Sequence, residues 1–501
     1  MADSKTTYTS GDAVRRSGLW AFVQRIGTQV ISFVLGVFLT RALLPEDFGL
    51  MAMVVVFSGF ARVLQDFGFG TALIQYKKPT PEHYSSVFWF NMAMGGVLAA
   101  ILALCAPLLV RFYDQPDLLW VARFMALEFV LSALVSVQSV RLKKTFRFKL
   151  VSLVDLVASL LYYAVALPLA WTDWGVWALV GGTLARLVVR TAGLWMFAGW
   201  VPRLVLHTDR LRELFRFGSF ATGNSLLGYL TRNTDNLLIG RMAGDAALGA
   251  YNKAYMMMML PLQNVVNAIR EVMMPAMSEA QDDDERLRMM YLRTIGLIAF
   301  VVFPIMAGIS VVAEPLIIGL YGEAWQSTVP LLEVLAVVGA LQSIISFGGT
   351  VYFAKGRPDI PFRLRLVTVP LVLAIFFVGI KAFGVQGMVY MYVGFSLLRF
   401  LVDAILLRSV IGLRIRSVWQ TTIPPAILST VMYMAVRGLR ALPWEDAVHE
   451  LVSLVACAAT GAVVYAGGAI LFRFKANREI VRFAPGLAKI PVIGRYLRHD
   501  E

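Results

Sequence analysis

Arginines stand inside the first two apolar runs of this 501-residue chain, where charged side chains are rare. The first run carries Arg25 and Gln29 on one polar stripe at three- and four-residue steps, and the second run carries Arg62 on a similar stripe. Because a guanidinium stays charged and offers forked donors that match phosphate, Arg25 and Arg62 predict an anion-binding site. The alternative is structural, with Arg62 paired to Asp66 one turn later and Arg25 reaching the inner membrane surface.

Polar groups on the seventh and eighth apolar runs are expected to line the opposite wall of the same cavity. Arg232 and Asp235 lie on the seventh run, and Lys253 and Asn264 on the eighth. We predict that Arg232, Lys253 and Asn264 contribute to substrate binding together with Gln29. The spacing of Arg232 and Asp235 also fits an internal ion pair, and a further alternative has Asp235 taking up a coupling cation.

A short motif containing an arginine, an acid and a glycine occurs twice. It reads LTRALLPEDFG and then, 200 residues later, IGRMAGDAALG, so that Arg41 matches Arg241 and Gly49 matches Gly249. Both arginines fall at expected outer helix ends, where a cation offsets the negative end of the helix dipole. We interpret the motif as a structural cap and turn, written twice because the fold is repeated.

Further matches at corresponding helix ends extend this repeat. Residues 106–113 (APLLVRFY) resemble residues 314–321 (EPLIIGLY). We therefore predict two parallel six-helix lobes, related by an axis along the membrane normal and facing a central cationic cavity, with two C-terminal helices outside the repeat. Chance similarity between apolar helices is the alternative.

The composition places the chain in the bilayer. It is 58% hydrophobic and only 16% charged, with a mean hydropathy of +0.69, which is typical of an all-α integral membrane protein. The net charge of +14 comes from cations between apolar runs, so it indicates membrane topology and gives no support to nucleic-acid binding. The sequence has no nucleotide-binding motif, catalytic constellation or metal-ligand cluster, so we expect neither an enzyme nor a metal or other cofactor.

The apolar runs predict a polytopic topology. A bilayer core about 30 Å thick needs roughly twenty apolar residues per helix, and the sequence contains about fourteen such runs. Lys and Arg concentrate in every second gap, which predicts that both termini are cytoplasmic. The predicted spans are 18–41, 49–72, 85–110, 118–140, 151–170, 175–198, 215–240, 248–270, 293–313, 328–353, 361–381, 386–407, 420–438 and 450–472.

These spans group into five segments. We predict a cytoplasmic N-terminal segment, a first lobe of six helices, a second lobe of six helices, a pair of further helices and a basic cytoplasmic tail, at residues 1–17, 18–200, 201–410, 411–475 and 476–501.

The entry region resembles that of the Wzx-type polysaccharide flippases, in the colanic-acid and teichuronic-acid exporter branch of the multidrug/oligosaccharidyl-lipid/polysaccharide superfamily. The residues that carry this resemblance are GLWAFVQRIGTQVISFVLGVFLTRALLPEDFGLMAM at 18–53 and FARVLQDFGFGTALIQ at 60–75. The resemblance covers residues 18–472. It implies a protein of the bacterial inner membrane that moves undecaprenyl-diphosphate-linked oligosaccharides from the cytoplasmic to the periplasmic leaflet by alternating access.

The resemblance also implies roles for particular residues. Arg25 and Arg62 match the family's cavity cations by helix and depth, and Lys253 does so more weakly, so a diphosphate-binding role is implied for them. Some relatives couple transport to sodium ions or protons through acids of the seventh, eleventh and twelfth helices. Asp235 and Asp403 are available here, whereas the eleventh span has no carboxylate.

The role of Asp403 and the driving force of transport each leave alternatives open. Arg399 stands one turn before Asp403 and is spaced to neutralise it. The driving force implied by the family is Na+, H+ or the membrane potential, and the implied partners are the lipid bilayer, a polysaccharide polymerase and export machinery.

Two other functions compete with the flippase interpretation. A drug or cation antiporter of the same superfamily shares the two lobes, but a cationic substrate favours carboxylates and aromatic rings over arginines. A membrane polysaccharide polymerase or ligase also handles lipid-linked sugars, but such enzymes need a sizeable outer loop, which this sequence lacks.

Overall fold

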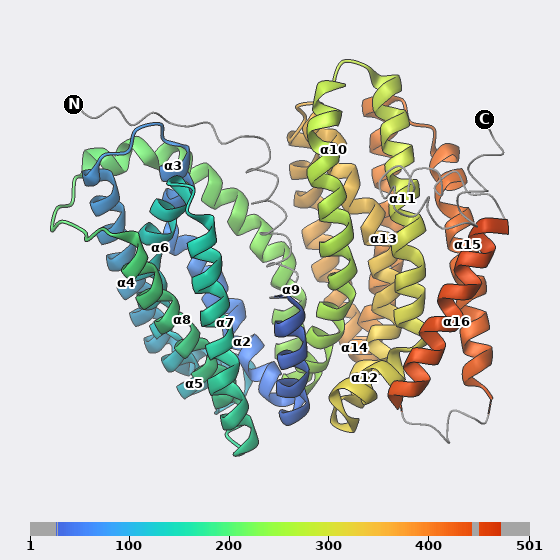
Figure 1. The fold of residues 1–501 in the computed structure, drawn as a ribbon, viewed down its shortest axis with the longest axis horizontal. Helices are drawn as coiled ribbons and strands as arrows, with labels where there is room; N and C mark the ends of the chain where they lie inside the picture. Colours follow the sequence, from blue (N-terminus) through green and yellow to red (C-terminus); the bar gives the residue numbers. More distant parts are fainter. Residues whose placement is uncertain (1–26, 28, 443–449, 472–501) are drawn as a thin grey trace. The chain divides into compact units, whose positions relative to one another are not determined.

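The computed structural model describes residue 27 and residues 29–442 and 450–471, and the secondary structure of these residues is entirely helical. The predicted all-α class is therefore confirmed (Figure 1). Within this part of the chain, eight helical segments are long and apolar enough to cross a membrane: Pro45–Asp66, Pro81–Tyr113, Leu118–Lys144, Phe148–Trp171, Asp284–Val311, Glu323–Ala354, Asp359–Ile411 and Val452–Leu471. The number of fourteen crossings stays a prediction.

The chain divides into two compact units, Met1–Ala246 and Ala247–Glu501. The division falls within α9 (Thr208–Pro261), later than the lobe boundary predicted at residue 200. The two boundaries differ because the first part of α9 packs against α2 of the first unit. The Tyr229 hydroxyl, for example, donates to the Val55 carbonyl over 2.9 Å. The six-helix lobes remain a prediction.

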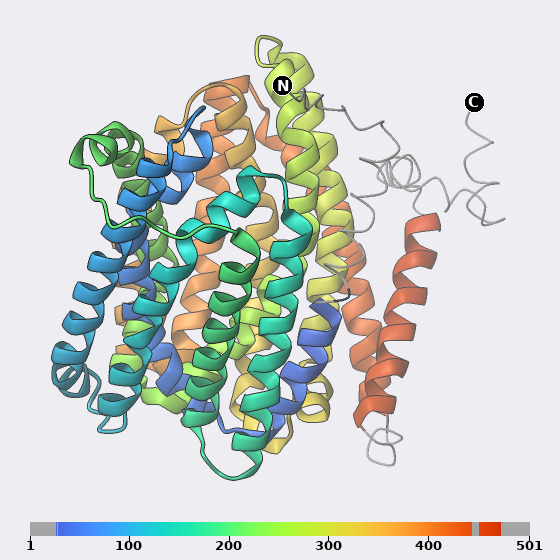
Figure 2. The same cartoon turned by 60° about the vertical axis from the view of Figure 1, so that its left-hand side comes forward.

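The first unit is built around α6 (Leu127–Lys144). This helix contacts its neighbours on several sides, and Phe129, Ala133 and Val137 on it are almost completely buried. Figures 1 and 2 show α4, α6 and α8 running side by side. The other helices of the unit are Gln29–Ala42, α2 (Pro45–Asp66), α3 (Phe69–Gln75), α4 (Pro81–Tyr113), α5 (Leu118–Met125), α7 (Phe148–Trp171), α8 (Val176–Ala198) and the first part of α9.

The second unit is built around α11 (Asp284–Val311) and α13 (Val329–Ala354), which pack against each other. The 53-residue α14 (Asp359–Ile411) breaks at Gly384, whose φ of 70° needs a glycine, and this break separates two predicted spans. The other elements are the end of α9, η1 (Leu262–Val266), α10 (Asn267–Glu279), α12 (Ala313–Tyr321), η2 (Glu323–Thr328), α15 (Ile415–Arg440) and α16 (Glu450–Leu471).

Both copies of the repeated motif lie at a break between helices. In the first copy, α2 begins at Pro45, and the carboxylate of Asp47 accepts from the backbone N–H of Leu44 over 3.0 Å. A proline at the first position and an acid in the first turn are favourable helix starts. In the second copy, α9 breaks at Gly244, where φ is 85°.

The other residues of the motif surround these breaks. Gly49 is buried and lies against the backbone of Asp245, so that a Cβ at position 49 would overlap the Asp245 carbonyl. Arg41 and Arg241 are exposed, and Arg241 lies 5.9 Å from the centroid of the Phe112 ring. Gly249 is buried in the second unit.

Candidate functional site

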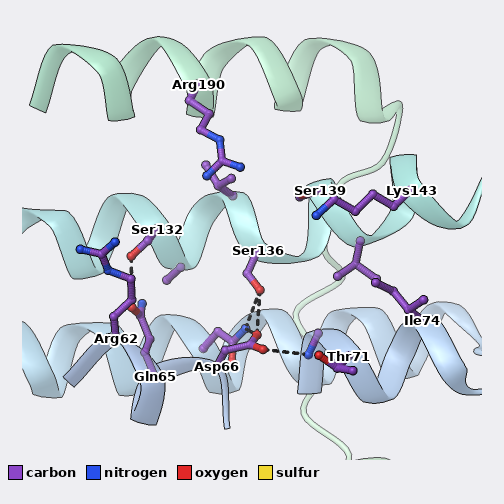
Figure 3. Close-up of a pocket in the computed structure, with 15 residues that line it drawn as sticks. Arg62, Gln65, Asp66, Thr71, Ile74, Ser132, Ser136, Ser139, Lys143 and Arg190 are labelled. Carbon is purple, nitrogen blue, oxygen red and sulfur yellow. Dashed lines mark hydrogen bonds between the residues drawn. The ribbon is translucent and has the colours of Figure 1, made fainter. Parts of the chain in front are cut away.

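A pocket of about 290 Å³ lies in the first unit among α2, α3, α4, α6 and α8. Figure 3 shows its charged groups, which are Arg62 and Asp66 from α2, Lys143 from α6 and Arg190 from α8. Hydroxyl and amide side chains supply most of the remaining polar lining. Apolar spans therefore enclose a polar space with fixed charges.

Arg62 is held by an acid from another helix. Its guanidinium forms an ion pair with Glu128 of α6, which is buried, whereas half of the Arg62 side chain remains exposed. The predicted structural alternative, a pair with Asp66 on the same helix, is wrong. A guanidinium carries five N–H donors, and half of this side chain is open to an anion.

The residue three positions after Arg62 lies in the interior of the unit. Gln65 is buried, donates from Nε2 to the Phe129 carbonyl over 2.6 Å, and accepts from the Ser132 hydroxyl over 3.1 Å. Gly95 makes room for this amide, since a Cβ there would lie 2.8 Å from Nε2 of Gln65. Gln65 thus ties α2 to α6 and fixes the helix face on which Arg62 stands.

Asp66 is surrounded by neutral donors. Its Oδ1 accepts from the Ser136 hydroxyl over 3.0 Å and from Nδ2 of Asn91 over 3.3 Å (Figure 3). Its Oδ2 accepts from the backbone N–H of Gly70 over 3.1 Å, at the start of α3. The carboxylate therefore joins four elements of the first unit.

The remaining cations of the pocket differ in their partners. Arg190 donates from Nε to Asp155 of α7 over 2.7 Å. Lys143 is exposed, and no ion pair is found for it in the described part of the chain. Two of the three cations are thus neutralised by acids outside the pocket lining.

A second charged cluster joins the start of α9 to the region of α3 and α4. Glu213 accepts from the Tyr76 hydroxyl over 2.6 Å and from Nη1 of Arg210 over 2.9 Å, and it lies 3.2 Å from Nε2 of the buried His83. Glu213 precedes the span predicted to begin at residue 215. The hydrogen bonds from Tyr76, His83 and Arg210 lower the pKa of Glu213 to about 2.

None of the other predicted binding residues that the structure describes lines this pocket. Arg25 is outside the described residues. Gln29 is exposed on its helix, and Asn264 is exposed and donates to the Leu260 carbonyl over 3.0 Å. Arg232 is exposed on α9.

Lys253 is almost fully buried in the second unit. Its ammonium lies 5.1 Å from the centroid of the Tyr321 ring and 5.2 Å from that of Trp325, which are cation–π distances. These contacts give Lys253 a packing role against α12 and η2.

The two acids predicted to take a coupling cation are both buried. Asp235 accepts from the backbone N–H of Asn236 over 2.8 Å. Asp403 lies 3.6 Å from Nε of Arg399, as the one-turn spacing indicated, and its Oδ1 lies 3.4 Å from the Tyr352 hydroxyl. Within the described residues, no group of three or more His, Cys, Asp or Glu side chains is placed to hold a metal ion.

The sequence did not identify several residues that line the pocket or pair with its cations. Glu128 is a carboxylate inside an apolar span, which is a usable signal, but nothing in its position indicates Arg62 as its partner. Asp155 gives the same signal inside the predicted span 151–170, but its partner Arg190 again lies on another helix. Asn91 and Ser136 carry no such signal, because their role comes from contacts between helices.

Long apolar helices enclose a polar pocket with fixed charges. This arrangement defines a polytopic membrane protein that holds polar groups within the bilayer. A family model described as polysaccharide biosynthesis protein matches residues 38–330, which is more than half of the chain. The chain belongs to this polysaccharide biosynthesis protein family.

Curated relatives confirm the predicted resemblance. The chain is 26% identical to the teichuronic acid biosynthesis protein TuaB of Bacillus subtilis, over 81% of this chain and 84% of that protein. It is 26% identical to the lipopolysaccharide biosynthesis protein WzxC of Escherichia coli, over 80% and 83% of the two chains. It is also 26% identical to the succinoglycan biosynthesis transport protein ExoT of Rhizobium meliloti, over 92% and 93%.

Solved structures show the same fold at low sequence identity. The lipid II flippase MurJ in an inward closed conformation aligns with a TM-score of 0.72 at 14% identity, covering 92% of this chain and all of MurJ. An inward-facing multidrug resistance transporter of the MATE family aligns with a TM-score of 0.60, covering 77% of this chain and 94% of that one. The fold is therefore one that transport proteins use.

Proposed function

We propose that this protein is a flippase that moves undecaprenyl-diphosphate-linked oligosaccharides from the cytoplasmic to the periplasmic leaflet for the assembly of a surface polysaccharide. Membership of the polysaccharide biosynthesis protein family carries this proposal. The relatives named for teichuronic acid, lipopolysaccharide and succinoglycan synthesis support it, as does the fold shared with a lipid II flippase.

Arg62 supplies the chemistry that the proposed substrate needs. A diphosphate carries its charge into a region of low polarity, so a fixed guanidinium with open donors offers charge and geometry together. Glu128 orients this guanidinium and leaves half of the side chain exposed. In the proposal, Arg25, Arg232, Gln29 and Asn264 supply further polar contacts; Lys253 is the weaker candidate, because aromatic rings cover its ammonium.

The proposal places the protein in the bacterial inner membrane with both termini in the cytoplasm. It acts as a transporter by alternating access and carries out no covalent chemistry. Its partners in the proposal are the lipid bilayer, the polymerase that extends the polysaccharide and the machinery that exports it. Na+, H+ or the membrane potential supplies the driving force.

Deletion of the gene in its own host tests the function. We expect loss of a surface polysaccharide and accumulation of its lipid-linked repeat unit in the cytoplasmic leaflet, both reversed by the wild-type gene. Unchanged polysaccharide together with increased sensitivity to cationic drugs would contradict the proposal and favour the antiporter alternative, whose fold is the same.

A further inference from the structure

Asp66 differs from the other charged groups of the pocket in how its charge is balanced. Arg62 is paired with Glu128 and Arg190 with Asp155, but no Lys, Arg or His of the described chain forms an ion pair with Asp66. Its three hydrogen-bond donors are a hydroxyl, an amide and a backbone N–H. The carboxylate therefore carries a net negative charge at the end of an apolar span.

The oxygen atoms around Asp66 form a ligand set. Asn91 is 1% exposed, and its Oδ1 is buried without a hydrogen-bond partner. Its Nδ2 donates to Oδ1 of Asp66 over 3.3 Å and to the Ser136 hydroxyl oxygen over 3.1 Å, so a half turn of the amide, in exchange for these two hydrogen bonds, brings the oxygen to the carboxylate. The Ser136 hydroxyl faces the same carboxylate oxygen, so the carboxylate and hydroxyl oxygens converge, and the amide oxygen joins them after this half turn.

The electrostatics favour a cation of single charge. An uncompensated carboxylate within a membrane-spanning bundle costs several kcal/mol by order of magnitude, so a counterion is strongly favoured. The end of α2 at Asp66 adds the partial negative charge of its helix dipole, which the start of α3 at Phe69 offsets in part. One carboxylate with neutral oxygens balances one positive charge, whereas it would leave a divalent ion half compensated.

We propose that Asp66, Ser136 and Asn91 bind a sodium ion in the first unit, reached through the pocket. The ion takes one carboxylate oxygen, the hydroxyl oxygen and the amide oxygen as protein ligands, and water completes its shell. Lys143 is the pocket's cation without an ion pair in the described chain, and its exposed position allows it to remain in water beside the bound ion.

A purely structural role for Asp66 makes a different prediction. Its Oδ2 accepts from the Gly70 N–H and so caps the start of α3, and Gly70 permits this approach, since a Cβ there would lie 3.0 Å from Oδ2. A cap stabilises the protein to the same extent in any salt. Sodium binding adds stability that depends on the sodium concentration.

Thermal unfolding of the purified full chain in detergent tests the site, with NaCl, KCl and choline chloride compared at constant ionic strength. We expect a saturable rise in Tm with NaCl that Asp66→Asn abolishes and that needs about tenfold more sodium in Ser136→Ala. Direct binding of radioactive sodium should give one site per chain in the wild type and none in Asp66→Asn.

A matched variant locates the site. Asp403→Asn removes a buried carboxylate from the second unit and should keep the sodium response. Sodium binding that persists in Asp66→Asn, or that is lost in Asp403→Asn, would overturn the proposal, as would a wild type without bound sodium. Sodium binding in detergent does not depend on the proposed flippase function. Only a role for the ion in driving transport rests on that function.

Discussion

Arg62 and Glu128 depend on each other at the scale of single residues. Arg62→Ala leaves the buried Glu128 carboxylate without its counterion, and we expect a loss of about 1–3 kcal/mol in the free energy of unfolding. The expected loss of stability is smaller than for a fully buried ion pair, because half of the arginine side chain is exposed. Thermal unfolding in detergent measures the effect.

The double variant Arg62→Ala with Glu128→Gln is the control. A neutral amide at position 128 removes the uncompensated charge, so most of the lost stability should return. An equal loss of stability in the single and double variants would show that the ion pair is not the cause.

This pair also shows what spacing alone can and cannot predict. The polar stripe of the second apolar run was evident in the sequence, because helix periodicity places Arg62 and Asp66 on neighbouring turns. The true partner lies on α6, and periodicity within one helix contains no information about contacts with another. By contrast, Arg399 and Asp403 are neighbours on one helix, and their pairing was predictable.

Glu213 gives a pH dependence with a definite sign. Its pKa is lowered from the ordinary 4.5 to about 2 in the folded protein by hydrogen bonds from Tyr76, His83 and Arg210. Its contribution to stability is therefore fully present above pH 4.5 and disappears as the pH falls towards 2. Glu213→Gln should lower the Tm at pH 7, and the gap to the wild type should narrow below pH 4.5. A gap that stays constant across this range would contradict the assignment.

At the scale of elements, the first part of α2 depends on a close approach of two backbones. Gly49→Ala adds a Cβ that overlaps the Asp245 carbonyl, and because backbone cannot move aside as a flexible side chain does, we expect a cost of about 1–3 kcal/mol. The matched control is Gly96→Ala in α4, where a Cβ would meet nothing within 4 Å. That variant should be neutral or more stable by up to about 1 kcal/mol. Equal effects of the two variants on Tm would contradict the packing argument.

Most helices could be predicted from the sequence, and the breaks inside two long helices lie at glycines. Apolar length indicates where a chain can cross a bilayer, and each predicted span from 49–72 onwards overlaps helical residues of the described chain. Gly244 and Gly384 mark breaks inside long helices, as positive φ requires. The early part of α9 contacts the first unit through tertiary packing, which the repeat pattern does not contain.

At the scale of the whole molecule, composition and family resemblance were the strongest signals. The hydropathy of the chain predicts an integral membrane protein, and the motif around Arg41 and Gly49 lies within the resemblance to polysaccharide exporters, which the family match confirms. The pocket itself was not predictable. Its walls come from five helices between residues 45 and 198, and only their packing brings Asn91, Ser136 and Asp66 together.

The central claim is that the molecule moves a lipid-linked oligosaccharide across the bilayer. The most direct test reconstitutes the protein in liposomes with fluorescent undecaprenyl-diphosphate oligosaccharide and follows its exposure to an impermeant glycan-modifying enzyme. We predict faster exposure with the wild type than in protein-free liposomes, and slower exposure with the Arg62→Ala and Glu128→Gln double variant, which should remain folded. Exposure no faster than in protein-free liposomes for every lipid-linked glycan tried would contradict the flippase function.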